Sequence, residues 1–137
     1  MKFTTKAKTL EDLSGLIKLS QVLPILSFSI KGLRGNKLKL LKKIRDFFID
    51  DFLIVRSSAF NEDNEINSNA GHYESVLNIP RDDDKKLLEA IAKVELSLGS
   101  NPKNELFIQP MLKNMCLCGV AFTADIDTLA PYYIINY

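Results

Sequence analysis

Residues 52–59 read Phe-Leu-Ile-Val-Arg-Ser-Ser-Ala, an apolar run that becomes polar at its carboxyl end. The apolar residues 52–55 predict a short strand that is buried in a sheet. Arg56, Ser57 and Ser58 follow at once, so an arginine and two hydroxyls are expected where this strand ends. A guanidinium presents a fixed fork of hydrogen-bond donors that suits phosphate oxygens.

A polar stretch then leads the chain into a second predicted strand. Residues 61–69 are polar, and the pattern from Tyr73 to Ile79 predicts the strand. Gly71 comes just before it and would let backbone N–H groups approach a ligand closely. Ser75 would add a hydroxyl donor nearby. Together with Arg56, these residues form a set suited to a polyphosphate.

The residue types alone also permit a purely structural interpretation, which is the favoured one at this level. Arg56 would pair with Glu62 or Asp63 and hold the loop in place, and Gly71 would only serve a turn. Ion pairs of this kind often have no role beyond structure. His72 is the only histidine, and histidine can act as a covalent nucleophile. A loop histidine at the rim of the site is the plainer interpretation.

Apolar spacing and capping residues predict three helices. Thr9 and Asp12 signal the start of the first, which should end near Gln21. Asn36 is the expected N-cap of the second, after a turn flanked by glycines at 32–35. Three aspartates precede the third helix, where the helix dipole favours negative charge. The apolar stripes of the second and third helices are, respectively, Leu38, Leu41, Ile44, Phe47 and Phe48, and Leu87, Leu88, Ile91, Val94 and Leu98.

The other apolar runs predict strands. Residues 22–26 contain a proline and are expected as an extended segment at a sheet edge. Three further runs occupy 106–111, 117–123 and 132–137, and a turn at 113–114 predicts that the first two pair as a hairpin. This order of elements favours an α+β domain with helices packed on one face of a mainly antiparallel sheet.

The basic residues of 37–45 and the two cysteines are interpreted as structural rather than as ligand-binding groups. Four lysines and an arginine between Lys37 and Arg45 are expected to form a solvated helix face, because no aromatic residues interleave with them. Cys116 and Cys118 would share one face of a strand. They lack a second cysteine pair and a nearby histidine, so they make a poor zinc site. Buried free thiols are expected instead.

The bulk composition is that of an ordinary globular domain. The chain has 137 residues, of which 46% are hydrophobic and 26% charged, and its formal net charge is +1. This balance points to neither a nucleic acid nor a membrane as the main partner. The start, residues 1–5, lacks the apolar core of a secretory signal, and no apolar run is long enough to span a bilayer. A cytoplasmic location is therefore expected.

Several blocks of the sequence, taken in order, resemble the phosphoenolpyruvate synthase and pyruvate phosphate dikinase family. The shared blocks lie at residues 55–59, 62–63, 70–71, 74–75, 77–78, 108–111 and 118–125. The last is similar to the family's glycine-valine-x-phenylalanine-threonine strand. Residues 6–10 look like a degenerate form of its lysine-glycine-alanine-asparagine-leucine entry, without the glycines. Phe60 stands where the family usually has threonine.

The resemblance implies an ATP site in the first part of an ATP-grasp domain, with residues 1–137 as its N-terminal subdomain. Arg56 and Lys6 would contact the phosphates, Gly71 would supply the glycine of the phosphate-side loop with Ser75 next to it, and Gln109 would lie at the base or ribose. The expected cofactors are ATP and Mg²⁺. In this family the metal ligands come from the second half of the domain and the phosphoryl-accepting histidine from a separate domain, so this chain alone is expected to be inactive.

Three functions remain open. The first is the ATP-binding portion of a phosphotransferase that acts on pyruvate through a phosphohistidine. The second is a fragment of a related kinase whose acceptor is an antibiotic, a glucan or the glutamine amide in capsule synthesis. The third is a degenerate interaction module, against which the mostly intact nucleotide residues argue. Expected partners are a nucleotide and the remaining domains of the parent protein.

The apolar run at 132–137 continues to Tyr137 without a polar tail or a turn residue. This run predicts that the chain is cut from a longer protein. An unpaired strand there would leave an open sheet edge, and such edges pair with other chains. A tendency to self-associate is therefore expected.

Overall fold

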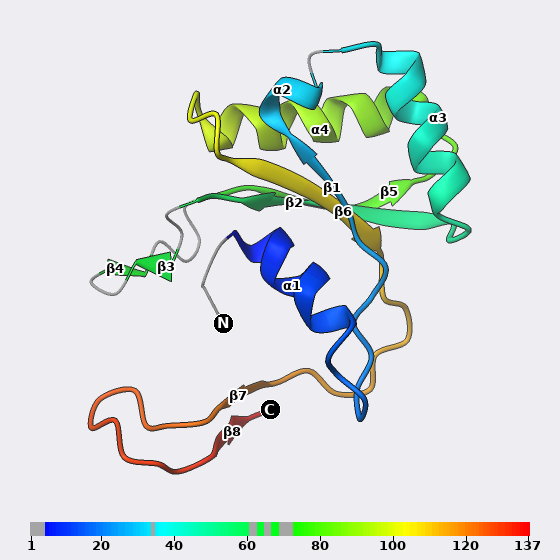
Figure 1. The fold of residues 1–137 in the computed structure, drawn as a ribbon. Helices are drawn as coiled ribbons and strands as arrows, with labels where there is room; N and C mark the ends of the chain where they lie inside the picture. Colours follow the sequence, from blue (N-terminus) through cyan, green and yellow to red (C-terminus); the bar gives the residue numbers. More distant parts are fainter. Residues whose placement is uncertain (1–4, 34, 61–62, 65–66, 69–72) are drawn as a thin grey trace.

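The computed structural model describes residues 5–33, 35–60, 63–64, 67–68 and 73–137 (Figure 1). Its centre is an antiparallel sheet with the strand order β1-β6-β2-β5. The expected α+β class is confirmed. The strands of this sheet are β1 (Leu26–Ser29), β2 (Phe52–Ser58), β5 (Ser75–Pro80) and β6 (Glu105–Pro110). The helices are α1 (Lys6–Ser14), α2 (Ile30–Leu33), α3 (Lys37–Phe47) and α4 (Asp84–Leu98), and two small sheets pair β3 (Asp63–Asn64) with β4 (Asn67–Ser68) and β7 (Val120–Phe122) with β8 (Ile134–Asn136).

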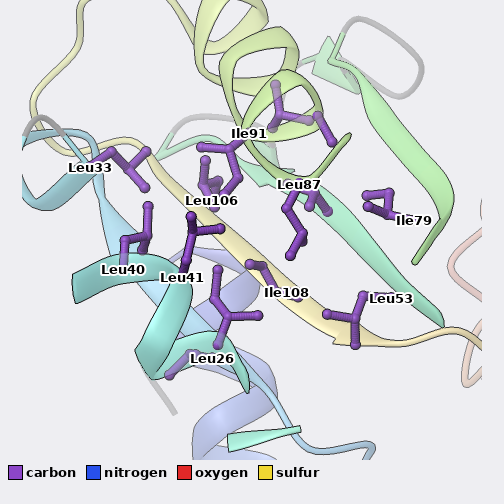
Figure 2. Packing of buried hydrophobic residues seen from close by; sticks show 14 of the residues in the cluster. Leu26, Leu33, Leu40, Leu41, Leu53, Ile79, Leu87, Ile91, Leu106 and Ile108 are labelled. Atoms are coloured by element: carbon purple, nitrogen blue, oxygen red, sulfur yellow. The ribbon is translucent and has the colours of Figure 1, made fainter. Parts of the chain in front are cut away.

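The main core lies between the sheet and the helices α2, α3 and α4. Alternate residues of β2 and β6, such as Leu53, Val55 and Ile108, point into it and are fully buried. Leu87 and Ile91 of α4 meet them from the helix side (Figure 2). Burial of these apolar side chains is the main force that holds the two layers together.

Helix α1 lies on the opposite face of the sheet from α3 and α4 (Figure 1). The expectation that the helices pack on one face is therefore right for α3 and α4 but not for α1. Central strand β6 explains the difference, because Phe107 lies on the face away from the main core and would be exposed without a cover. With α1 packed against β6, Phe107 is fully buried.

Helix α1 also starts and ends earlier than its sequence pattern predicts. It begins at Lys6 with Thr5 as N-cap, where the Thr5 hydroxyl accepts a hydrogen bond from the Lys8 N–H, and it ends at Ser14. Leu16, which helical spacing placed on the apolar face of the predicted helix, is exposed. The predicted helix from Thr9 to Gln21 was wrong at both ends, because the N-cap is Thr5 rather than Thr9 and the helix stops at Ser14.

The other two long helices agree better with prediction. Asn36 is the N-cap of α3, as expected, and accepts hydrogen bonds from the N–H groups of Leu38 and Lys39. Asp83 is the N-cap of α4 and accepts from the Lys86 N–H, which lowers the pKa of its carboxyl group. In α3 the side chain of Leu38 is exposed although it was placed in the apolar stripe.

The other predictions for α3 and for the turn before it are also confirmed only in part. Leu40 is buried where Leu38 was expected, Phe47 is half exposed, and the lysines of α3 are exposed as predicted. The glycine-flanked turn proposed at 32–35 is partly replaced by α2, which ends at Leu33.

The predicted hairpin between residues 106–111 and 117–123 does not form. Strand β6 already has a neighbour on each side, β1 and β2, so neither edge is free for the next strand. Strand β7 pairs instead with β8 in a separate two-stranded ribbon. A Cβ at Gly119 would lie 2.5 Å from the Asn136 carbonyl oxygen, so only glycine permits this close approach.

The two cysteines are also placed differently from the prediction. Cys116 and Cys118 precede β7 and are both exposed free thiols. The expected strand from 117 is shorter than predicted and starts at Val120, which leaves both cysteines outside regular structure.

Candidate nucleotide site on the face covered by α1

A row of side chains crosses the sheet on the face that α1 partly covers. Arg56 is paired in register with Ser75 of β5 on one side and with Phe107 of β6 on the other, and Phe107 is paired with Ser27 of β1. Residues paired in this way project from the same face of a sheet. Gln109, two residues after Phe107, projects from that face as well. The structure therefore places Arg56, Ser75 and Gln109 on one face of three adjacent strands.

Helix α1 covers part of this face, where it packs against β6 and is bonded to Ser27 of β1 and to Ser58 at the end of β2. The Ser27 hydroxyl of β1 donates to the Glu11 carboxylate of α1 with an O···O distance of 2.6 Å. Over the other side of the row the side chains are more open, since Arg56 is half-buried and Ser75 is exposed. Arg56 of β2 and Ser75 of β5 therefore border a part of the sheet that α1 leaves accessible.

Arg56 is held against an aromatic ring. The centre of its guanidinium lies 5.5 Å from the centroid of the Phe107 ring, a distance at which a cation is attracted by the face of the ring. Within the described residues Arg56 has no carboxylate partner. The alternative pairing with Glu62 or Asp63 involves side chains outside the described part of the structure. A planar guanidinium fixed on a buried ring keeps its donors available for an anion.

Gln109 is buried, with 6% of its surface exposed, and none of the hydrogen bonds among the described residues involves its carboxamide. A buried amide without a partner is costly, so it is a candidate for contact with a ligand. Asn104 offers a contrast because it is equally buried but donates to the Leu98 carbonyl and accepts from the Phe60 N–H.

Lys6 lies at the first position of α1, and the residues on either side of it are bonded to the sheet. The Thr5 hydroxyl donates to Glu105, and the Ala7 N–H donates to the hydroxyl of Ser58. The backbone at Lys6 therefore lies over the same face as Arg56. Gly71, the remaining predicted site residue, lies outside the described residues, as does His72.

A guanidinium, a hydroxyl and a carboxamide lie on this face and the backbone of a lysine lies over it, a set of residue types that fits the oxygens of a nucleotide. This arrangement is consistent with a comparison to known proteins. The family described as pyruvate phosphate dikinase, AMP/ATP-binding domain, matches residues 31–102, just over half of the chain. The chain belongs to this family. No curated protein and no solved structure matches the chain.

The dikinase-type match includes Arg56, Gly71 and Ser75 but neither Lys6 nor Gln109. The resemblance stated from the sequence is thereby confirmed at the level of the family, and the matched domain supports nucleotide binding. Lys6 and Gln109 lie outside the matched residues but close to them in the fold. Gln109 projects from the face that carries Arg56, and the backbone of Lys6 lies over that face.

A metal site is a separate matter. No cluster of three or more histidine, cysteine or acidic residues in the described part of the chain is placed to hold a metal ion. In the same part of the chain, no helix has the length and apolar character needed to cross a bilayer.

Sequence reasoning missed Phe107, Thr5, Ser58 and Glu105 as supports of the site. Strand alternation could have placed Phe107 on the face of Gln109, but its pairing with Arg56 is known only from the sheet register. The contact of Thr5 with Glu105 joins residues 100 positions apart and has no local signal.

Proposed function

We propose that this dikinase-type chain binds ATP on the α1-covered face of its sheet, as the N-terminal subdomain, residues 1–137, of an ATP-grasp domain. Arg56 and Lys6 contact the phosphates, Gly71 and Ser75 border them, and Gln109 contacts the base or ribose. The observation that carries the proposal is the position of Arg56. Its guanidinium lies on Phe107 between the strand of Ser75 and the strand of Gln109, with no acidic partner among the described residues.

The parent protein is proposed to be a phosphoenolpyruvate synthase-like phosphotransferase of the cytoplasm. ATP would phosphorylate pyruvate through a phosphohistidine, with Mg²⁺ ligands and the histidine supplied by other parts of the parent. What this chain contributes is binding and orientation of the phosphates, which phosphoryl transfer depends on. The chain alone is proposed to bind ATP without catalysing transfer.

Calorimetry with ATP tests the site through the substitution Arg56→Ala. A hydrogen bond to a charged group contributes roughly 1.5–3 kcal/mol, which corresponds to a loss of about ten- to 150-fold in affinity. Weak binding by the unaltered chain should therefore fall below detection in this variant.

The matched control is Arg45→Ala. Arg45 lies on α3, on the other side of the sheet, so its removal changes the net charge equally and should leave ATP affinity unchanged. Equal affinity of the unaltered chain and Arg56→Ala would reject the assignment, as would an equal loss in both variants.

A further inference from the structure

Two hydrogen bonds attach the start of α1 to the sheet, one on each side of Lys6. The Thr5 Oγ1 donates to Glu105 Oε2 at 2.6 Å, and the Ala7 N–H donates to Ser58 Oγ at 2.8 Å. Glu105 and Ser58 are themselves paired in register across β6 and β2. Thus one cross-strand pair holds both neighbours of Lys6, and we refer to these four residues as the α1 latch.

The α1 latch is largely shielded from water. Thr5 is 6% exposed, and Ala7 and Ser58 are fully buried. The hydrogen bond from the Ala7 N–H to Ser58 is buried, so losing it would leave a polar group without a partner, which is strongly disfavoured. The Thr5 hydroxyl also accepts from the Lys8 N–H as the N-cap of α1. One side chain therefore both starts the helix and attaches it to the sheet.

The latch also determines where Lys6 stands relative to Arg56. The pair formed by Ser58 and Glu105 is two residues along the strands from the pair formed by Arg56 and Phe107, on the same face. Two residues of a strand span about 7 Å. The backbone of Lys6 is thus fixed about one row of side chains away from the guanidinium, a separation that an extended lysine side chain can bridge toward a shared polyphosphate.

We propose that the α1 latch positions Lys6 for the nucleotide, so that Thr5, Ser58 and Glu105 govern ATP affinity without touching ATP. This inference rests on the proposed function. A ligand that binds a lysine must overcome the conformational freedom of the backbone that carries it. Holding the backbone by both flanking residues removes this contribution before the nucleotide arrives.

The first test compares Thr5→Val with Thr5→Ser. Valine has the shape of threonine but neither donates to Glu105 nor caps α1, whereas serine does both. ATP affinity should fall about tenfold in Thr5→Val, the equivalent of one charge-assisted hydrogen bond, and should be restored in Thr5→Ser. Glu105→Ala breaks the same contact from the sheet side and should give a similar loss.

A control separates the latch from the general effect of losing a helix cap. Asn36→Ala removes the N-cap of α3, which lies on the other face of the sheet. It should reduce stability as Thr5→Val does and leave ATP affinity unchanged. Unfolding curves for each variant establish that the folded state is present during the binding measurement.

A double-mutant cycle with Lys6→Ala distinguishes positioning of Lys6 from a purely structural role of the latch. If the latch acts through Lys6, Thr5→Val should lower ATP affinity in the chain that retains Lys6 but should cause no further loss once Lys6 is alanine, measured at higher ATP. Additive losses in the Lys6→Ala background would overturn the inference.

The possible failures are distinguishable. An unaltered chain that does not bind ATP would reject the proposed function and the latch with it. Binding that depends on Arg56 but is unchanged in Thr5→Val and Glu105→Ala would reject the latch alone. Loss of affinity in Asn36→Ala equal to that in Thr5→Val would likewise reject it, because the effect would then follow stability.

Discussion

Gln109 and Asn104 are both buried amides, and the structure predicts that replacing them with apolar residues has opposite effects on stability. Gln109 forms no hydrogen bond among the described residues, whereas Asn104 donates to Leu98 and accepts from Phe60. In Gln109→Met a residue of similar length replaces an unpaired amide. Removing that unpaired group should raise the free energy of unfolding by about 1–3 kcal/mol.

The matched substitution Asn104→Leu should do the reverse. It preserves the shape of the side chain but leaves the Leu98 carbonyl and the Phe60 N–H without partners. Each buried group left in this way costs about 1–3 kcal/mol. The comparison holds the type of change constant and varies only whether partners are present.

Thermal unfolding followed by circular dichroism measures both variants in a chain that has no tryptophan. A gain of 1–3 kcal/mol corresponds to a rise of roughly 3–12 °C in melting temperature for a domain near this size. Calorimetry with ATP completes the assay. Gln109→Met should lose about three- to tenfold in ATP affinity, the contribution of one neutral hydrogen bond.

Two results would refute this reasoning. If Gln109→Met destabilises the fold as much as Asn104→Leu, the carboxamide has an internal partner. If it stabilises the fold and leaves ATP affinity unchanged, Gln109 is not part of the nucleotide site. A variant that is more stable but binds ATP less tightly would support the site, since binding residues are often retained at a cost in stability.

Two further predictions concern the core and the carboxyl-terminal ribbon. Leu87 is fully buried and Leu96 is 83% exposed in the same helix. In chemical denaturation Leu87→Ala should lower the free energy of unfolding by about 2–5 kcal/mol, whereas Leu96→Ala should change it little. Equal effects would contradict the described core. The β7–β8 ribbon exposes the apolar side chains of Val120 and Ile135. Light scattering should therefore show an average mass that rises with protein concentration, and Ile135→Lys should suppress this rise. A strictly monomeric unaltered chain would count against self-association.

Much of the local structure was determined by the sequence alone. The N-cap at Asn36, the start of the strand β2 and the long amphipathic helix α4 were each predicted near their observed positions, although β2 extends to Ser58 and so includes Arg56, which was expected just beyond its end. Such features depend on residues within one or two turns of a helix, or within one strand, so a short window contains the information. The family was recognised for a related reason, because its motifs are short blocks in a fixed order.

Tertiary structure alone decided which strands became neighbours. The hairpin expected from the turn after β6 was wrong because both edges of β6 are occupied by β1 and β2. Pairing of strands depends on which edges and apolar faces are still free once distant segments have folded. No local pattern near Lys113 or Cys116 contains that information.

The candidate site shows the same division between local and distant information. The residue types identified Arg56 and Ser75 as polar groups with the chemistry to bind a polyphosphate, and the family resemblance added Gln109. Only the sheet register brought them to one face, and only the hydrogen bond between Thr5 and Glu105, across 100 positions, placed α1 over that face. Contacts this distant in sequence form because the folded chain buries Phe107 and pairs the polar groups around it, a result of the whole sheet rather than of any one segment.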